Sequence, residues 1–169
     1  MVEQSIENFI DEVLAGNMQK DALGFAAYLR ANEMLFERGK GYWEDKLYWV
    51  IKYKDEWVCC IFINNGEDNE PDGWIIWLED GETDCYADFP LDDRMKEIAW
   101  KNVDFCGNCG YCTGGTRKTI FGNEFDNVCR QIMIFEKPDA ETLKCVKKLA
   151  EIRKNDILSR ARQSGAPSV

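Results

Sequence analysis

Three cysteines, Cys106, Cys109 and Cys112, stand within one seven-residue segment, and a fourth, Cys129, follows seventeen residues later. Two cysteines separated by two residues can direct both sulfurs at one ion, and a glycine after the second, here Gly110, lets the backbone turn beneath the metal. The chain has no histidine. Because tetrahedral zinc takes four ligands, the pattern predicts a structural Zn²⁺ site made by Cys106, Cys109, Cys112 and Cys129. Such a site is closed to water and substrate.

Two other chemistries fit the same cysteines. The triple spacing also opens the ferredoxin run for iron–sulfur clusters, but that run continues with a cysteine at the position of Thr116. A thiol redox pair, Cys106 with Cys109, is the second alternative, although no helix is predicted to begin there. Free thiols in a surface loop are the plainest interpretation. For the other four cysteines we expect small buried hydrophobic side chains: Cys59, Cys60, Cys85 and Cys145.

The aromatic side chains suggest a second site. The chain holds six tryptophans, more than one core of this size needs, and four of them fall in predicted strands. An aromatic pocket with an acidic residue holds flat or cationic molecules by stacking and cation–π attraction. We therefore predict a site for a small aromatic or cationic ligand, while simple core packing is the competing interpretation. Its residues are Trp49, Trp57, Trp74, Trp77 and Glu79.

An enzyme is the alternative function for the same pocket. Glu79 paired with Asp84 or Glu44 could perform acid–base catalysis, provided that one carboxyl group is enclosed and its pKa is raised. We predict binding without catalysis, and the absence of histidine excludes His-based catalytic triads. A redox or iron–sulfur sensor remains a third class of function.

Charge and hydropathy limit the partners. The net charge is −10, and the positive excess is confined to the segment from Lys137 onward. We expect no nucleic-acid partner, because an acidic surface repels phosphates. No apolar run is long enough to cross a bilayer, and Glu3 and Glu7 stand where a signal peptide would begin. We predict a cytoplasmic location, no membrane partner and a possible protein partner.

The elements that must position these residues follow from the hydrophobic periodicity. Helical spacing is replaced by alternation after residue 45, and helical spacing returns at the carboxyl end. This predicts an α+β fold: an antiparallel sheet of about four to six strands, with helices at both termini and a Cys-rich metal-knuckle insert. We expect one domain over 1–162, its insert at 103–116 and a flexible tail at 163–169. The expected helices cover 2–15, 18–38, 91–101 and 138–162, and the expected strands cover 47–54, 57–63, 74–79, 83–88, 117–121 and 128–136.

Three stretches carry a resemblance to a known family: "FPLDDRMKEIAWKNVDFCGNCGYC", "GGTRKTIFGNEFDNVC" and "KPDAETLKCVKKLAEIRKNDI". Together they span Phe89 to Ile157, and "RANEMLFERGKGYWEDKLYWVIKYKDEWVC" extends the likeness over most of the chain. The chain resembles a functionally uncharacterised bacterial family of cysteine-containing α+β domains. The resemblance implies that the four cysteines of the zinc set recur, and it implies no activity. A weaker likeness, of fold only, is to GyrI-like effector-binding domains, which cup small molecules on an antiparallel sheet.

Overall fold

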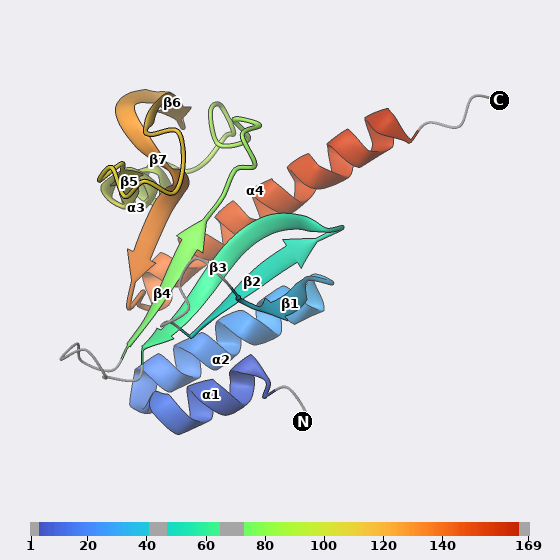
Figure 1. The fold of residues 1–169 in the computed structure, drawn as a ribbon, viewed down its shortest axis with the longest axis vertical. Coiled ribbons are helices and arrows are strands. Elements are labelled where there is room, and N and C mark those ends of the chain that lie inside the picture. Colours follow the sequence, from blue (N-terminus) through green and yellow to red (C-terminus); the bar gives the residue numbers. More distant parts are fainter. Residues whose placement is uncertain (1–3, 41–46, 65–72, 166–169) are drawn as a thin grey trace.

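The protein is an α+β fold built on a seven-stranded antiparallel sheet (Figure 1). The structure, a computed structural model, describes residues 4–40, 47–64 and 73–165. Along the sheet the strands follow the order β1-β2-β3-β4-β7-β5. β6 pairs with the amino-terminal half of β7. The elements are α1 (Ile6–Val13), α2 (Gly16–Ala31), β1 (Leu35–Arg38), β2 (Tyr48–Tyr53), β3 (Glu56–Asn64), β4 (Gly73–Leu78), α3 (Asp93–Lys101), β5 (Val103–Phe105), β6 (Thr116–Ile120), β7 (Asn123–Glu136) and α4 (Ala140–Ser164).

Local sequence explains where three helices begin. Ser5, Asp92 and Asp139 precede α1, α3 and α4, and each side-chain oxygen accepts a hydrogen bond from a backbone N–H three residues later, at 3.4, 2.9 and 2.8 Å. A cap of this kind stabilises a helix by about 0.5–2 kcal/mol. The hairpin between β2 and β3 turns through Lys54 and Asp55, both at positive φ, as a tight two-residue hairpin requires.

One predicted helix is too long, one predicted strand is wrong, and the sheet of the described residues has more strands than expected. The helix predicted over 18–38 ends at Ala31; the chain reverses at Glu33, whose φ is 63°, and then forms β1. Pairing with β2 outweighs the helical spacing of Met34 and Leu35. Residues 83–88 form turns instead of a strand, because the preceding Asp80 accepts hydrogen bonds from local groups. The predicted insert is shorter, since its first residues form β5.

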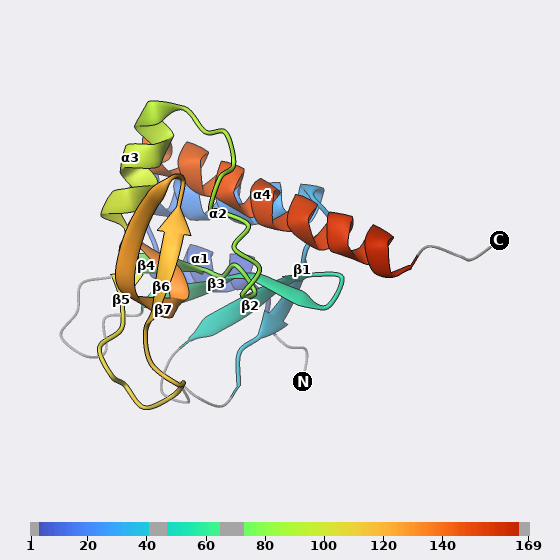
Figure 2. The same ribbon diagram turned by 90° about the horizontal axis from the view of Figure 1, so that it is seen from above.

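The sheet separates two apolar clusters. Helices α1, α2 and α4 cover one face, which we call the helix face (Figures 1 and 2). The other face, which we call the cavity face because two cavities open along it, carries a smaller aromatic cluster. Its residues are Tyr48, Val50, Cys60 and Phe62, with Trp57, Ile75 and Trp77 packed against them.

Within the described ranges, every helix is too short or too polar to cross a bilayer. The longest, α4, reaches Ser164 and so includes the first two residues of the predicted tail. Its buried apolar side chains belong to the helix-face core and end at Ile157.

Candidate functional site

The strand pairing carries the cysteine-rich loop, residues 106–115, across one face of β7. Phe105 at the end of β5 and Thr116 at the start of β6 both pair with Val128 of β7. Because β5 and β6 lie on opposite edges of β7, the intervening loop must cross the strand. Loop residues and Cys129 line the same cavity, whereas Val128 is in the helix-face core. The loop therefore passes over the cavity face, where Cys129 lies.

Asn127 holds both ends of this loop. The Cys106 amide donates to the Asn127 carbonyl at 2.8 Å, and the Asn127 side-chain amide donates to the Cys106 carbonyl at 3.1 Å. At the other end, Gly115 approaches so closely that a Cβ would lie 2.8 Å from the Asn127 carbonyl carbon. Only glycine fits this contact, so the loop is fixed to β7 at its start and at its end.

A cavity of about 680 Å³, which we call the main cavity, lies between this loop and the sheet. The sheet side of its wall includes Trp57, Trp77 and Glu79, and Arg130 and Gln131 come from β7. The ladder between β5 and β7 is interrupted between Val103 and Phe105, which gives β7 the irregular stretch that supplies these residues. The loop side consists of Gly107, Cys109, Tyr111 and Cys112.

The main cavity brings together only part of the predicted ligand site. Trp57, Trp77 and Glu79 line it, so three of the five predicted residues share one wall. Trp49 and Trp74 lie on the helix face instead. Trp74 is 1% exposed and its ring lies 6.1 Å from that of Phe25 in α2. The alternation along each strand explains the division, since neighbouring positions point to opposite faces.

Glu79 is the most enclosed acid of the cavity wall. The residue is 8% exposed, and burial raises the pKa of its carboxyl group, an effect that Arg130 partly offsets. Arg130 Nε is 4.0 Å from Glu79 Oε1, too far for a strong hydrogen bond. Among the hydrogen bonds of the described residues, none reaches this carboxylate, which leaves it poorly solvated and poorly paired.

Asp104 is a second acid on the same wall, and the sequence analysis missed it. Burial raises the pKa of Asp104, and a hydrogen bond from Cys129 lowers it in part. Burial also raises the pKa of Cys129 to about 11, so the thiol is neutral and donates to the carboxylate. The available signal was that Asp104 lies between two apolar residues, Val103 and Phe105, as in a strand. The sequence prediction placed all three in the insert, whereas they form β5.

Arg153 of α4 also lines the cavity, and the sequence analysis missed it as a site residue. It is 1% exposed. Its guanidinium donates to the Trp57 carbonyl at 3.0 Å and pairs with Asp156 at 3.0 Å and Glu56 at 3.2 Å. These contacts fix the backbone at Trp57. The available signal was spacing: Arg153 lies four residues after Leu149 and four before Ile157, inside the apolar stripe of α4.

Three of the four cysteines of the predicted zinc set line one cavity, but the four do not form a ligand set in the described residues. Cys109, Cys112 and Cys129 line the main cavity, and Cys106 Sγ accepts a hydrogen bond from the Asn108 amide at 3.4 Å. Amide donation to the first sulfur suits a metal knuckle. In the part of the chain that the structure describes, however, no three acidic or cysteine side chains are close enough to share an ion. Metal binding would require the loop to close on Cys129.

The other four cysteines lie away from this loop. Cys59, Cys60 and Cys145 are buried, and Cys85 is half-buried in the turns after β4. Burial raises the pKa of Cys85 and of Cys145 to about 12, so both are neutral thiols. Three of the four therefore pack as small apolar side chains, as predicted.

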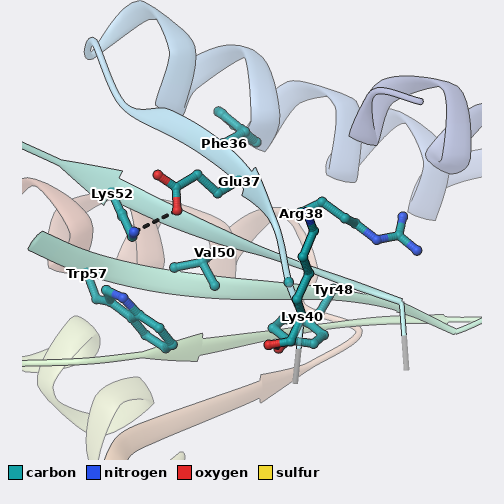
Figure 3. Close-up of a pocket in the computed structure, with 9 residues that line it drawn as sticks. Phe36, Glu37, Arg38, Lys40, Tyr48, Val50, Lys52 and Trp57 are labelled. Atoms are coloured by element: carbon teal, nitrogen blue, oxygen red, sulfur yellow. Dashed lines mark hydrogen bonds and ion pairs between the residues drawn. The ribbon is translucent and has the colours of Figure 1, made fainter. Parts of the chain in front are cut away.

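A second cavity, of about 510 Å³, opens beside β1 and β2 (Figure 3). Two of its basic residues, Lys52 and Arg38, already have internal partners. Lys52 Nζ lies 2.6 Å from Glu37 Oε2, and the Arg38 guanidinium lies over the rings of Phe9 and Trp49. Trp57 lines both cavities. The second cavity therefore extends the aromatic wall but adds no poorly paired acid.

The carboxylate pairs expected for an enzyme are not assembled in the described residues. Asp84 is exposed and binds Lys118 Nζ at 3.0 Å, outside the main cavity. Glu44 lies outside the described residues. No protein-family model, curated protein or solved structure matches the chain significantly. The two resemblances drawn from the sequence thus remain predictions.

Proposed function

We propose that this protein is a binding domain that takes up a flat aromatic cation in the main cavity and performs no catalysis. The observation that supports this most strongly is the meeting of Trp57, Trp77 and Glu79 on one cavity wall. A volume of about 680 Å³ is within the range of small-molecule sites. The role corresponds to the effector-sensing function expected from the GyrI-like resemblance.

The chemistry of the wall favours a positive charge. A cation over a tryptophan face gains about 0.5–2 kcal/mol, and the gain increases as water is excluded. Glu79 is already desolvated, so a bound cation would restore the interaction that the carboxylate lost on burial. The Arg153 guanidinium does not compete, because Glu56 and Asp156 engage it.

The cysteine loop is the proposed zinc-stabilised wall of the same cavity. Two features support a ligand set of Cys106, Cys109, Cys112 and Cys129. The loop crosses the face of β7 on which Cys129 lies, and the Asn108 backbone N–H donates a hydrogen bond to Cys106 Sγ. A structural zinc ion would supply rigidity and no reactive position. Asn127 hydrogen-bonds the start of the loop at Cys106 and lies against its end at Gly115, so closure would mainly move the middle of the loop.

Reduced thiols support the proposed cytoplasmic location. All eight cysteines are free in the structure. Structural disulfides persist in oxidising compartments, whereas cytosolic thiols stay reduced and available to a metal. We also propose that the protein, once it has bound its ligand, binds a protein partner.

Binding of matched probes tests the proposed function. N-methylquinolinium is a flat cation, and 1-methylnaphthalene is its neutral counterpart of nearly equal shape. We expect the cation to bind at least tenfold more tightly by titration calorimetry, because only the cation gains from Glu79 and the tryptophan faces. Glu79→Gln should remove most of that preference.

The same substitution on two faces provides the control. Trp57→Phe should weaken cation binding several-fold, since phenylalanine offers a weaker π face, whereas Trp49→Phe on the helix face should leave binding unchanged. Equal affinity for both probes, or equal effects of the two variants, would contradict the proposal.

A further inference from the structure

The register of the sheet places two acids at equivalent positions on either side of β7. Leu78 of β4 and Val103 of β5 both pair with Met133 of β7. Both neighbouring strands are antiparallel to β7, so they run in the same direction. Glu79 follows Leu78 and Asp104 follows Val103. Both acids therefore lie beyond Met133 in the same direction along the sheet.

Both acids point into the main cavity. Leu78 and Val103 belong to the helix-face core, whereas the residues that follow them, Glu79 and Asp104, both line the main cavity. They are separated by two inter-strand spacings, about 10 Å between backbones. The cavity thus presents two carboxylates on one wall, with β7 between them.

The remaining charges of the wall do not neutralise this pair. The lining includes four acidic and two basic residues, an excess of two negative charges. Arg153 is engaged by Glu56 and Asp156, and Arg130 approaches Glu79 only to 4.0 Å with its side chain 62% exposed. Among the described residues, no basic side chain is one of the groups that interact with the Asp104 carboxyl group. Within the described part of the wall, Glu79 therefore has only a long ion pair with Arg130, and Asp104 has none.

We infer that the ligand of the main cavity is an aromatic dication, with one cationic group for Glu79 and one for Asp104 and a flat ring system that crosses β7 between them. This inference rests on the proposed function. A ring system with a charged group at each end spans the distance between the two acids, and charge-assisted hydrogen bonds to carboxylates are the stronger kind. Amidinium groups suit both acids, because their paired N–H groups match the two oxygens of a carboxylate.

Diamidine and monoamidine probes test the inference. 4′,6-Diamidino-2-phenylindole carries a cationic group at each end, and the analogue lacking the 4′-amidine carries one. We expect the diamidine to bind at least tenfold more tightly to the full chain, measured by fluorescence at fixed ionic strength. Asp104→Asn should reduce this ratio to near one, and it should leave monoamidine affinity within about threefold if Glu79 holds the single charge.

The controls separate the two proposals. Asp93→Asn removes an exposed acid outside the cavity and should leave the ratio unchanged, which excludes a general charge effect. Circular dichroism checks that each variant is folded. A double-mutant cycle between Glu79→Gln and Asp104→Asn should show that both contribute to diamidine affinity. Equal affinity for the two probes, or a ratio unaffected by Asp104→Asn, would overturn the dication inference while the proposed function stands. Absence of binding by either probe would count against both.

Discussion

The two faces of the sheet use the same residue types for different purposes. On the helix face, Trp74 is buried in the core and its ring lies beside that of Phe25 in α2. On the cavity face, Trp77 packs against Phe62 at 4.6 Å but also borders about 680 Å³ of open volume. The difference lies in what covers each face: three helices seal one, whereas a glycine-rich loop held at Asn127 covers part of the other. A tryptophan becomes a candidate binding residue when its covering element leaves space.

Truncating one tryptophan on each face gives the largest expected effect. Trp74→Ala should lower the free energy of unfolding by about 3–5 kcal/mol, as for other large buried aromatics, because the helices cannot close the hole. Trp77→Ala should cost roughly 1–3 kcal/mol, since part of that side chain already faces open volume. Urea denaturation followed by circular dichroism measures both. Equal losses would show that the cavity face is packed as tightly as the helix face.

Zinc should affect only the cavity face. We expect purified protein to hold about one zinc ion per chain, and zinc at one hundred times its dissociation constant should add about 2.7 kcal/mol to stability. Cys109→Ser should abolish this gain and lower the melting temperature, because three ligands remain. Elemental analysis and thermal denaturation with and without a chelator provide the measurements.

A serine substitution away from the loop is the matched control for Cys109. Cys85→Ser should leave zinc content unchanged, whatever it does to stability, because Cys85 lies in the turns after β4 and outside the main cavity. Full zinc content in Cys109→Ser would remove that residue from the ligand set. A brown, iron-containing protein would instead favour the iron–sulfur alternative.

Periodicity predicted the fold class and most elements, but it could not assign faces. The β2–β3 hairpin is confirmed because alternation and a two-residue turn agree there. In β4, Trp74 and Trp77 are both aromatic, and nothing in their spacing reveals which face receives helices. β1 was missed because its pairing with β2 is non-local. Asp104 was missed for a related reason, since its importance depends on a register shared through β7.

The smallest expected effect concerns the protonation of Glu79, and it tests whether the cavity face is truly desolvated. Burial raises the folded-state pKa of Glu79 above its ordinary value of 4.5, so the folded protein binds this proton more tightly than the unfolded chain does. Wild-type stability therefore loses a contribution as pH rises from about 4.5 through the folded-state pKa.

Glu79→Gln imitates the protonated acid and does not titrate. The variant should match the wild type at acidic pH and exceed it at neutral pH, by urea denaturation across that range. The same substitution at exposed Glu82 controls for lost net charge. If the difference in the free energy of unfolding between Glu79→Gln and the wild type does not grow with pH, water reaches the Glu79 carboxylate freely. The cavity wall would then not be desolvated at Glu79, and the contrast between the two faces would be wrong.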